Sequence, residues 1–142
     1  MISLKDYITA SGKHPEFLQT WDQITAPQFL NANASMLLSK VSELISRAEI
    51  ESINITSGWR PSGYNKAIGG APNSKHVFAQ AIDIWDPDKK IGQWCQNNIE
   101  TLSELGLYME SLMTTHKSDD PNKRWVHLQT VAPESGNIIF IP

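Results

Sequence analysis

The chain has 142 residues, the length of one ordinary domain, and we expect a single domain over residues 1–142. Apolar residues make up 40% and charged residues 19%, a balance that excludes a disordered chain and a coiled coil. The formal net charge is −3 without a basic stripe, so we expect no nucleic acid partner. Cys95 is the only cysteine, so any metal site must be built from histidines and carboxylates.

The beginning of the chain lacks the basic start and apolar core of a secretory signal. No run of residues approaches the roughly 18 apolar positions of a membrane span, so we expect no membrane partner. These features predict a protein that is made in the cytoplasm. They do not predict its oligomeric state.

Helical patterns occupy the first part of the chain. Ser3 and Asp6 have the spacing of a capping box, which predicts a short first helix. Residues 15–34 contain prolines and clusters of amides and are expected to be irregular, so residues 1–35 would form a helical and irregular extension packed on the domain. Residues 36–48 place apolar side chains on one face of a helix, which predicts a core-facing helix of about three to four turns.

Alternating apolar and polar residues predict short strands in the rest of the chain. One helix is expected over residues 91–105, with Asp86 in the segment that caps it and Gly106 at its end. Residues 57–75 and 111–123 are expected to be loops. Helices first, followed by strands with one crossing helix, predict an α+β fold. The predicted strands are residues 53–56, 81–85, 107–110, 125–129 and 138–141.

Three residues with zinc-binding side chains lie on or near two of these strands. Asp83 projects from the face opposite two isoleucines, and His127 projects from the face opposite Val126 and Leu128. Together with His76, they would face one cavity if the two strands are neighbours. Two imidazoles and a carboxylate leave the fourth tetrahedral position for water, which is the catalytic kind of zinc site. From spacing alone, a hydrogen-bonded structural aspartate and core histidines are the alternative.

Several short motifs occur in an order that is more specific than any one motif alone. They are SGWRP at 57–61, YN at 64–65, GGA at 69–71, SKH at 74–76, AID at 81–83 and WVH at 125–127. Together they resemble the zinc D-alanyl-D-alanine carboxypeptidase family, which has the hedgehog/DD-peptidase fold. The resemblance covers residues 37–129 and implies a small antiparallel sheet with helices packed on one side. The tail at 135–142 is similar to that of a cell-wall endopeptidase branch common in phages and prophages.

The resemblance implies that His76, Asp83 and His127 bind a zinc ion. It also implies that Arg60 holds a carboxylate or carbonyl group of the substrate. The chemistry agrees, because a planar guanidinium can bind a carboxylate through two parallel hydrogen bonds. Without the motif, a solvated loop arginine would be the preferred interpretation.

Three further residues are expected to bind substrate beside Arg60. Ser74 lies two residues before the first histidine of the site and would orient the loop or a substrate oxygen; no base is placed to make it a nucleophile. Trp125 would form a wall of the cleft, although a core position is the default for a tryptophan. Gln129 shares the strand face of His127.

Two positions depart from the family pattern. A motif glycine is replaced by Ala79, a small change in the turn. The general base, a carboxylate three residues before the last histidine in many members, is replaced by Arg124, which cannot accept a proton. We expect Glu110 to act as the base, because a strand end positions a side chain better than a polar loop does. Asp119 and Asp120 are the other candidates and are expected to be solvated loop carboxylates.

These features predict a zinc metallopeptidase of the D,D- or L,D-type that hydrolyses peptidoglycan stem peptides, either as a carboxypeptidase or as an endopeptidase. The alternative is a zinc-binding domain that binds cell wall or builds a virion and has lost catalysis with the change at Arg124. A metal-free domain is a third possibility. The enzyme would reach the wall after lysis, through a pore or on a phage particle. His14 and His116 are expected at the surface.

Overall fold

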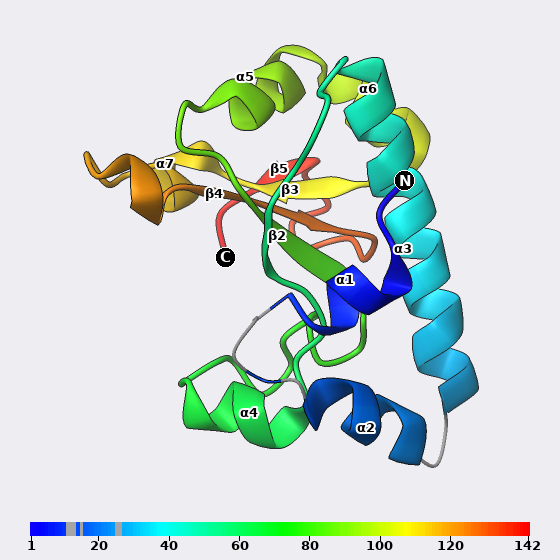
Figure 1. The fold of residues 1–142 in the computed structure, drawn as a ribbon. Coiled ribbons are helices and arrows are strands. Elements are labelled where there is room, and N and C mark those ends of the chain that lie inside the picture. Colours follow the sequence, from blue (N-terminus) through cyan, green and yellow to red (C-terminus); the bar gives the residue numbers. More distant parts are fainter. Residues whose placement is uncertain (11–13, 15, 25–26) are drawn as a thin grey trace.

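Five short strands form one sheet in the order β1-β2-β4-β3-β5 (Figure 1). The computed structural model describes residues 1–10, 14, 16–24 and 27–142. Among the described residues, three helices precede the first strand and the others lie between strands, so the chain combines helices with one small sheet and the predicted α+β class is confirmed. The strands are β1 (Ile55–Ser57), β2 (Ala81–Trp85), β3 (Tyr108–Glu110), β4 (Trp125–Gln129) and β5 (Ile139–Phe140).

The two longest strands, β2 and β4, are neighbours near the middle of the sheet. They pair antiparallel along their whole length, and Asp83 stands directly opposite His127. β3 pairs antiparallel with the other side of β4, whereas β5 pairs parallel with β3. The sheet is therefore mixed, and the expectation of a purely antiparallel sheet was wrong for the last strand. Because β4 already pairs with β2 and β3, the last strand, β5, pairs with the free edge of β3 and runs parallel to it.

Helices make up most of the remaining structure, and the longest of them, α3, runs along one side of the molecule (Figure 1). The helices are α1 (Leu4–Ile8), α2 (Glu16–Gln23), α3 (Pro27–Arg47), α4 (Ser62–Ala67), α5 (Lys90–Asn97), α6 (Ile99–Leu105), α7 (Leu112–Thr115) and the short 3-10 helix η1 (Pro121–Lys123). None of the helices in the described part of the chain has the length and apolar character needed to cross a membrane.

Helix is more extensive than the sequence predicted. α2 and the start of α3 lie in residues 15–34, which were expected to be irregular, and α3 begins at Pro27 rather than at Met36. A proline suits the first turn of a helix, because its missing N–H group would have no partner there. The short helices α4 and α7 likewise interrupt the segments 57–75 and 111–123, which were expected to be loops.

The predicted helix over residues 91–105 is divided into two. α5 ends at Asn98, whose φ of −129° and ψ of 47° are not helical and whose side chain donates a hydrogen bond to the Trp94 carbonyl. α6 then ends at Gly106, which has the left-handed φ of 67° expected for a glycine after a helix. At the other end, the Asp86 carboxylate accepts hydrogen bonds from the first backbone N–H groups of α5, as the predicted cap requires.

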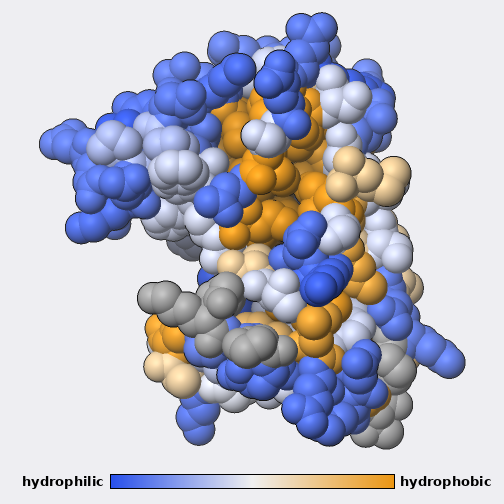
Figure 2. Space-filling view, in the orientation of Figure 1, coloured by the Kyte–Doolittle hydropathy of each residue, from blue (hydrophilic) through white to orange (hydrophobic). Residues whose placement is uncertain are grey.

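The two faces of the β2–β4 pair differ in character. Ile82, Ile84, Val126 and Leu128 are fully buried in one hydrophobic cluster that also contains side chains of α3. Burial of such side chains contributes about 1.5–3 kcal/mol each and sets which face of each strand points inward. In Figure 2, hydrophobic residues form a band through the middle of the visible face, with hydrophilic residues on both sides. The polar side chains that alternate with the buried ones therefore point away from the core.

Candidate metal centre

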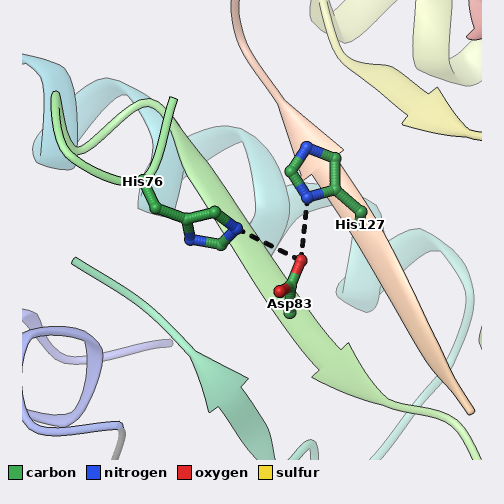
Figure 3. Close-up of side chains that lie close together, drawn as sticks. All are labelled: His76, Asp83 and His127. Atoms are coloured by element: carbon green, nitrogen blue, oxygen red, sulfur yellow. Dashed lines mark hydrogen bonds and ion pairs between the residues drawn. The ribbon is translucent and has the colours of Figure 1, made fainter. Parts of the chain in front are cut away.

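Two histidines and an aspartate meet on the polar face of the sheet (Figure 3). Asp83 lies in β2, His127 lies in β4, and His76 lies in the segment before β2. The Oδ1 atom of Asp83 is 3.3 Å from His76 Nε2 and 2.8 Å from His127 Nδ1. One donor atom from each residue lies within 4.8 Å of the other two. The structure thus brings together the three residues that were predicted to bind metal.

The turn before β2 places His76 in this group. Its backbone N–H donates a hydrogen bond to the hydroxyl of Ser74, which therefore orients the loop as one of its two predicted roles. Ala79 has a φ of 55°, in the left-handed region where a residue with a Cβ costs roughly 1–2 kcal/mol. This backbone conformation explains why the family pattern has a glycine there. The alanine is fully buried, and the turn keeps its shape.

Each histidine has one ring nitrogen hydrogen-bonded to an outer group of the protein, while its other ring nitrogen lies against the Asp83 carboxylate. His76 Nδ1–H donates to the Gly58 carbonyl at 2.8 Å, so its Nε2 faces Asp83. His127 Nε2–H donates to the Gln129 side-chain carbonyl at 3.0 Å, so its Nδ1 faces Asp83. The amide of Gln129 is itself held by a bond to the Val131 carbonyl. Such outer hydrogen bonds typically orient metal-binding histidines and select their tautomers.

These donor atoms fit a zinc ion. Zinc bonds to histidine nitrogen and carboxylate oxygen are about 2.0–2.2 Å long, which places neighbouring tetrahedral ligands roughly 3.3–3.5 Å apart. The 3.3 Å between Asp83 Oδ1 and His76 Nε2 lies in that range, whereas the 2.8 Å to His127 Nδ1 is shorter and is a direct hydrogen-bond distance. Three protein ligands of these types leave one position open for water or substrate.

The charges at the centre are strongly coupled. Burial opposes ionisation of Asp83, but the electrostatic interaction with His76 and the hydrogen bond from His127 hold the pKa of Asp83 well below its usual range. Burial disfavours protonation of His127, yet the hydrogen bond and charge of Asp83 raise the pKa of this imidazole. Asp83 is thus ionised across the physiological pH range.

Arg60 also lies at the centre. Its Nε donates to the Ser57 hydroxyl at 2.9 Å, and its Nη2 lies 3.4 Å from the second carboxylate oxygen of Asp83. The guanidinium is mostly buried, so the interpretation as a solvated loop arginine was wrong. In the part of the chain that the structure describes, Arg60 Nη1 has no hydrogen-bond partner and is available to a substrate.

The centre opens into a cleft of about 850 Å³. All eight residues predicted for the site line it: Arg60, Ser74, His76, Asp83, Glu110, Trp125, His127 and Gln129. Gln129, which was predicted to bind substrate, also accepts a hydrogen bond from the His127 ring. The sequence analysis missed Lys75, Glu134 and the end of the chain from Phe140 to Pro142, which also line the cleft. The end of the chain lies there because β5 returns to the β3 edge beside the centre.

Glu110 faces the centre from the end of β3. The β3–β4 register pairs Met109 with Leu128, so the next residue, Glu110, stands level with His127 on the polar face. Glu110 is half-buried, and burial raises the pKa of its carboxyl above the usual value, with the charge of Asp83 adding to the effect and His127 opposing it. Its position and its pKa both suit a group that accepts a proton.

Arg124 occupies the position where many family members carry the base, and its side chain forms hydrogen bonds to backbone carbonyls. Its guanidinium donates to the carbonyls of Pro87, Ser118 and Asp119 at 2.8, 3.1 and 3.2 Å. The side chain thereby fixes the loop before β4 and does not line the cleft. Asp120 caps η1, and neither Asp119 nor Asp120 lines the cleft, so Glu110 is the better candidate for the base.

The two remaining histidines differ in exposure. His14 is partly exposed and stacks on Phe17. His116 was expected at the surface, but this was wrong: it is buried, and its Nε2 lies 2.9 Å from the carboxylate of Asp86. Its position after a polar segment gave no signal of this partner, which is distant in the sequence.

A comparison with protein-family models finds one match, to the family described as peptidase M15, over residues 13–117. The matched segment contains His76, Asp83, Arg60 and Glu110, whereas His127 lies beyond it and joins the centre through the β2–β4 register. Comparisons with curated proteins and with solved structures find no match.

Proposed function

The chain belongs to the peptidase M15 family of zinc-dependent metallopeptidases, and on this premise we propose that it hydrolyses peptide bonds in the stem peptides of peptidoglycan. The observation that carries the proposal is the centre itself. Two histidines, each held by a hydrogen bond at its outer nitrogen, and an ionised aspartate point their inner nitrogen and oxygen atoms at one another in an open cleft. A purely structural cluster would not need a cleft beside it.

His76 Nε2, Asp83 Oδ1 and His127 Nδ1 would hold the zinc ion. When bound there, the ion would polarise the scissile carbonyl and lower the pKa of a water molecule toward about 7. Proton transfer and substrate binding would be carried out by side chains of the protein.

Glu110 would accept the proton of the attacking water and deliver it to the leaving amine. A carboxylate is a better general base near neutral pH when its pKa is raised toward that pH, and burial raises the pKa of Glu110. Glu110 replaces, from a neighbouring strand, the carboxylate that other members place where this chain has Arg124.

Arg60 would hold a carboxylate or carbonyl of the substrate through its free Nη1 donor, next to the reacting bond. Lys75, on the same rim, adds a second positive charge, which suits a peptide with a free carboxylate. Trp125 would form an apolar wall. These contacts would suit a peptide with a carboxylate near the reacting bond, and we propose that this bond is a D-amino-acid-containing bond of a stem peptide, cut by carboxypeptidase or endopeptidase activity. The site of action would then be the cell wall.

The proposal is tested by incubating the full chain with a stem pentapeptide and with cross-linked muropeptides, and by separating the products by mass. We expect hydrolysis that a chelator abolishes and zinc restores. Glu110→Gln should lower kcat by roughly 10²–10⁴-fold while zinc remains bound. Glu134→Gln is the matched control, since it removes another carboxylate from the same cleft, and it should retain activity.

Activity that survives the chelator, or full activity in His127→Ala, would contradict the proposal. A zinc-loaded protein that binds cell-wall sacculi but releases no product would favour the alternative, a binding domain without catalysis. Full activity in Glu110→Gln would leave a zinc peptidase but assign the base elsewhere.

A further inference from the structure

The helix at the start of the chain packs directly behind the metal centre. Tyr7, in α1, is completely buried, although α1 is short and most of its other residues are exposed. It lies outside residues 13–117, the segment that matches the family model. Its contacts lead to two of the three proposed zinc ligands.

The first connection runs through the backbone of the Ser57–Arg60 turn. The Tyr7 carbonyl accepts a hydrogen bond from the Trp59 backbone N–H at 3.3 Å. A Cβ atom on Gly58 would overlap the same Tyr7 carbonyl oxygen, closer than real Cβ atoms approach. Only glycine therefore lets the turn lie against α1 at this distance.

The Gly58 carbonyl in turn orients a ligand. It accepts the hydrogen bond from His76 Nδ1–H at 2.8 Å that leaves Nε2 free for the metal. A second backbone bond, from Arg60 N–H to the His76 carbonyl at 3.1 Å, ties the same turn to the same histidine. The position of α1 thus sets the position of the group that selects the His76 tautomer.

The second connection runs through the phenol. Tyr7 Oη–H donates to the Ala81 carbonyl at 2.8 Å, at the start of the strand that carries Asp83 two residues later. Burial, followed by the negative charge of Asp83, raises the pKa of Tyr7 well above its usual range, so the phenol keeps its proton and remains a donor.

We infer that Tyr7 is a positioning residue of the metal centre, which fixes His76 through Gly58 and the strand of Asp83 through Ala81. This inference rests on the proposed zinc site and extends it to a segment outside the matched family region. Loss of outer contacts that orient metal ligands typically lowers metal affinity by 10–100-fold. The expected effect is therefore on metal binding, beyond any loss of stability.

The test measures the zinc dissociation constant of the full chain by competition with a chromophoric chelator, and the visible spectrum of the Co²⁺-substituted protein. Tyr7→Phe keeps the packing and should weaken zinc binding about tenfold, with a changed cobalt spectrum. Gly58→Ala should weaken it by up to roughly 100-fold. Tyr64→Phe, the same chemical change in α4, is the matched control and should bind zinc as the unchanged protein does.

Leu102→Ala controls for stability, since it empties a fully buried position in α6 away from the centre. It should lower the melting temperature at least as much as Tyr7→Phe and leave zinc affinity unchanged. An unchanged dissociation constant and cobalt spectrum in Tyr7→Phe would overturn the inference, as would an equal loss of affinity in Leu102→Ala. If the unchanged protein binds no zinc, the proposed function fails instead.

Discussion

Two aspartates three residues apart, Asp83 and Asp86, each meet histidine side chains, yet they build opposite kinds of site. Asp83 lies in β2 and shares a cleft with His76 and His127. Asp86 follows β2 directly and pairs with His116 in the interior. The residue types are the same, so their surroundings must decide what they do.

In the cluster around Asp86, both carboxylate oxygens already accept hydrogen bonds from other parts of the fold. One carboxylate oxygen accepts the Ile91 N–H at 2.9 Å, and the other accepts the Gly92 N–H at 2.8 Å and His116 Nε2–H at 2.9 Å. The other nitrogen of His116 lies 3.0 Å from the Thr115 hydroxyl. These bonds cap α5 and tie it to α7, and the cluster is tightly packed, since a Cβ atom on Gly92 would lie 2.8 Å from Leu112, 3.0 Å from His116 and 3.1 Å from Asp86.

The cluster around Asp83 differs because its side-chain nitrogen and oxygen atoms face one another beside an open cleft. The outer nitrogen of each histidine is bonded to the protein, and the inner nitrogens and a carboxylate oxygen converge. A histidine–aspartate pair can therefore bind a metal when its nitrogen and oxygen atoms converge beside an accessible cleft. The same pair acts as a structural cap when backbone N–H groups already occupy the carboxylate oxygens.

The largest expected effect separates the two aspartates by metal binding. Asp83→Ala removes a ligand and should weaken zinc binding by more than about 100-fold, beyond the loss typical of an outer contact. Stem-peptide hydrolysis should fall by at least roughly 10³-fold, because activation of water depends on the metal. Zinc content by elemental analysis and product formation by mass measure the two effects. Zinc retained at one equivalent per chain with normal affinity would remove Asp83 from the ligand set.

The second effect concerns stability. Asp86→Ala leaves His116 Nε2 and the N–H groups of Ile91 and Gly92 buried without this partner; at roughly 1–3 kcal/mol for each buried polar group left unsatisfied, the loss is at least about 3 kcal/mol. The free energy of unfolding from urea denaturation should fall by about this amount. Zinc affinity of the remaining folded protein should be unchanged. A variant that instead loses zinc at full stability would erase the distinction between the clusters.

The third effect is a pH dependence that belongs to the cleft alone. A general base must be unprotonated, and burial raises the pKa of Glu110, so kcat/KM should rise with pH and reach half its maximum above the ordinary glutamate value of 4.5. Below that midpoint, activity should fall about tenfold per pH unit. Zinc affinity measured at each pH separates this effect from metal loss. A midpoint at or below 4.5 with zinc fully bound would contradict the assignment.

The smallest effect tests whether burial gives the Asp86 pair its importance. Arg47 forms two exposed ion pairs, with Glu43 and with Glu104, each at 2.9 Å. Because water and salt screen exposed charges, Arg47→Ala should change the free energy of unfolding far less than Asp86→Ala does. The same urea titration measures it. A loss as large as that of Asp86→Ala would show that burial is not what separates the two pairs.

Local patterns in the sequence predicted the strands well and the helices less well. Alternation around Asp83 and His127 placed both side chains on the polar face, because a strand has only two faces and apolar neighbours choose between them. The predicted helix boundaries were wrong at Pro27, where α3 begins, and at Asn98, where α5 ends. A proline that can start a helix also interrupts other structures, and an asparagine that breaks α5 from α6 leaves the apolar spacing intact.

The sequence by itself determined the chemistry of this protein: which residues can bind a metal, which faces they occupy and the order of the motifs around them. The tertiary structure decided what those residues meet. It paired β2 with β4 and directed Arg124 toward backbone carbonyls. It also placed Gln129 within hydrogen-bond distance of His127, buried His116 against Asp86 and packed Tyr7 against Gly58. Local patterns record periodicity and residue type, whereas these contacts join residues distant in the chain and depend on how the core packs.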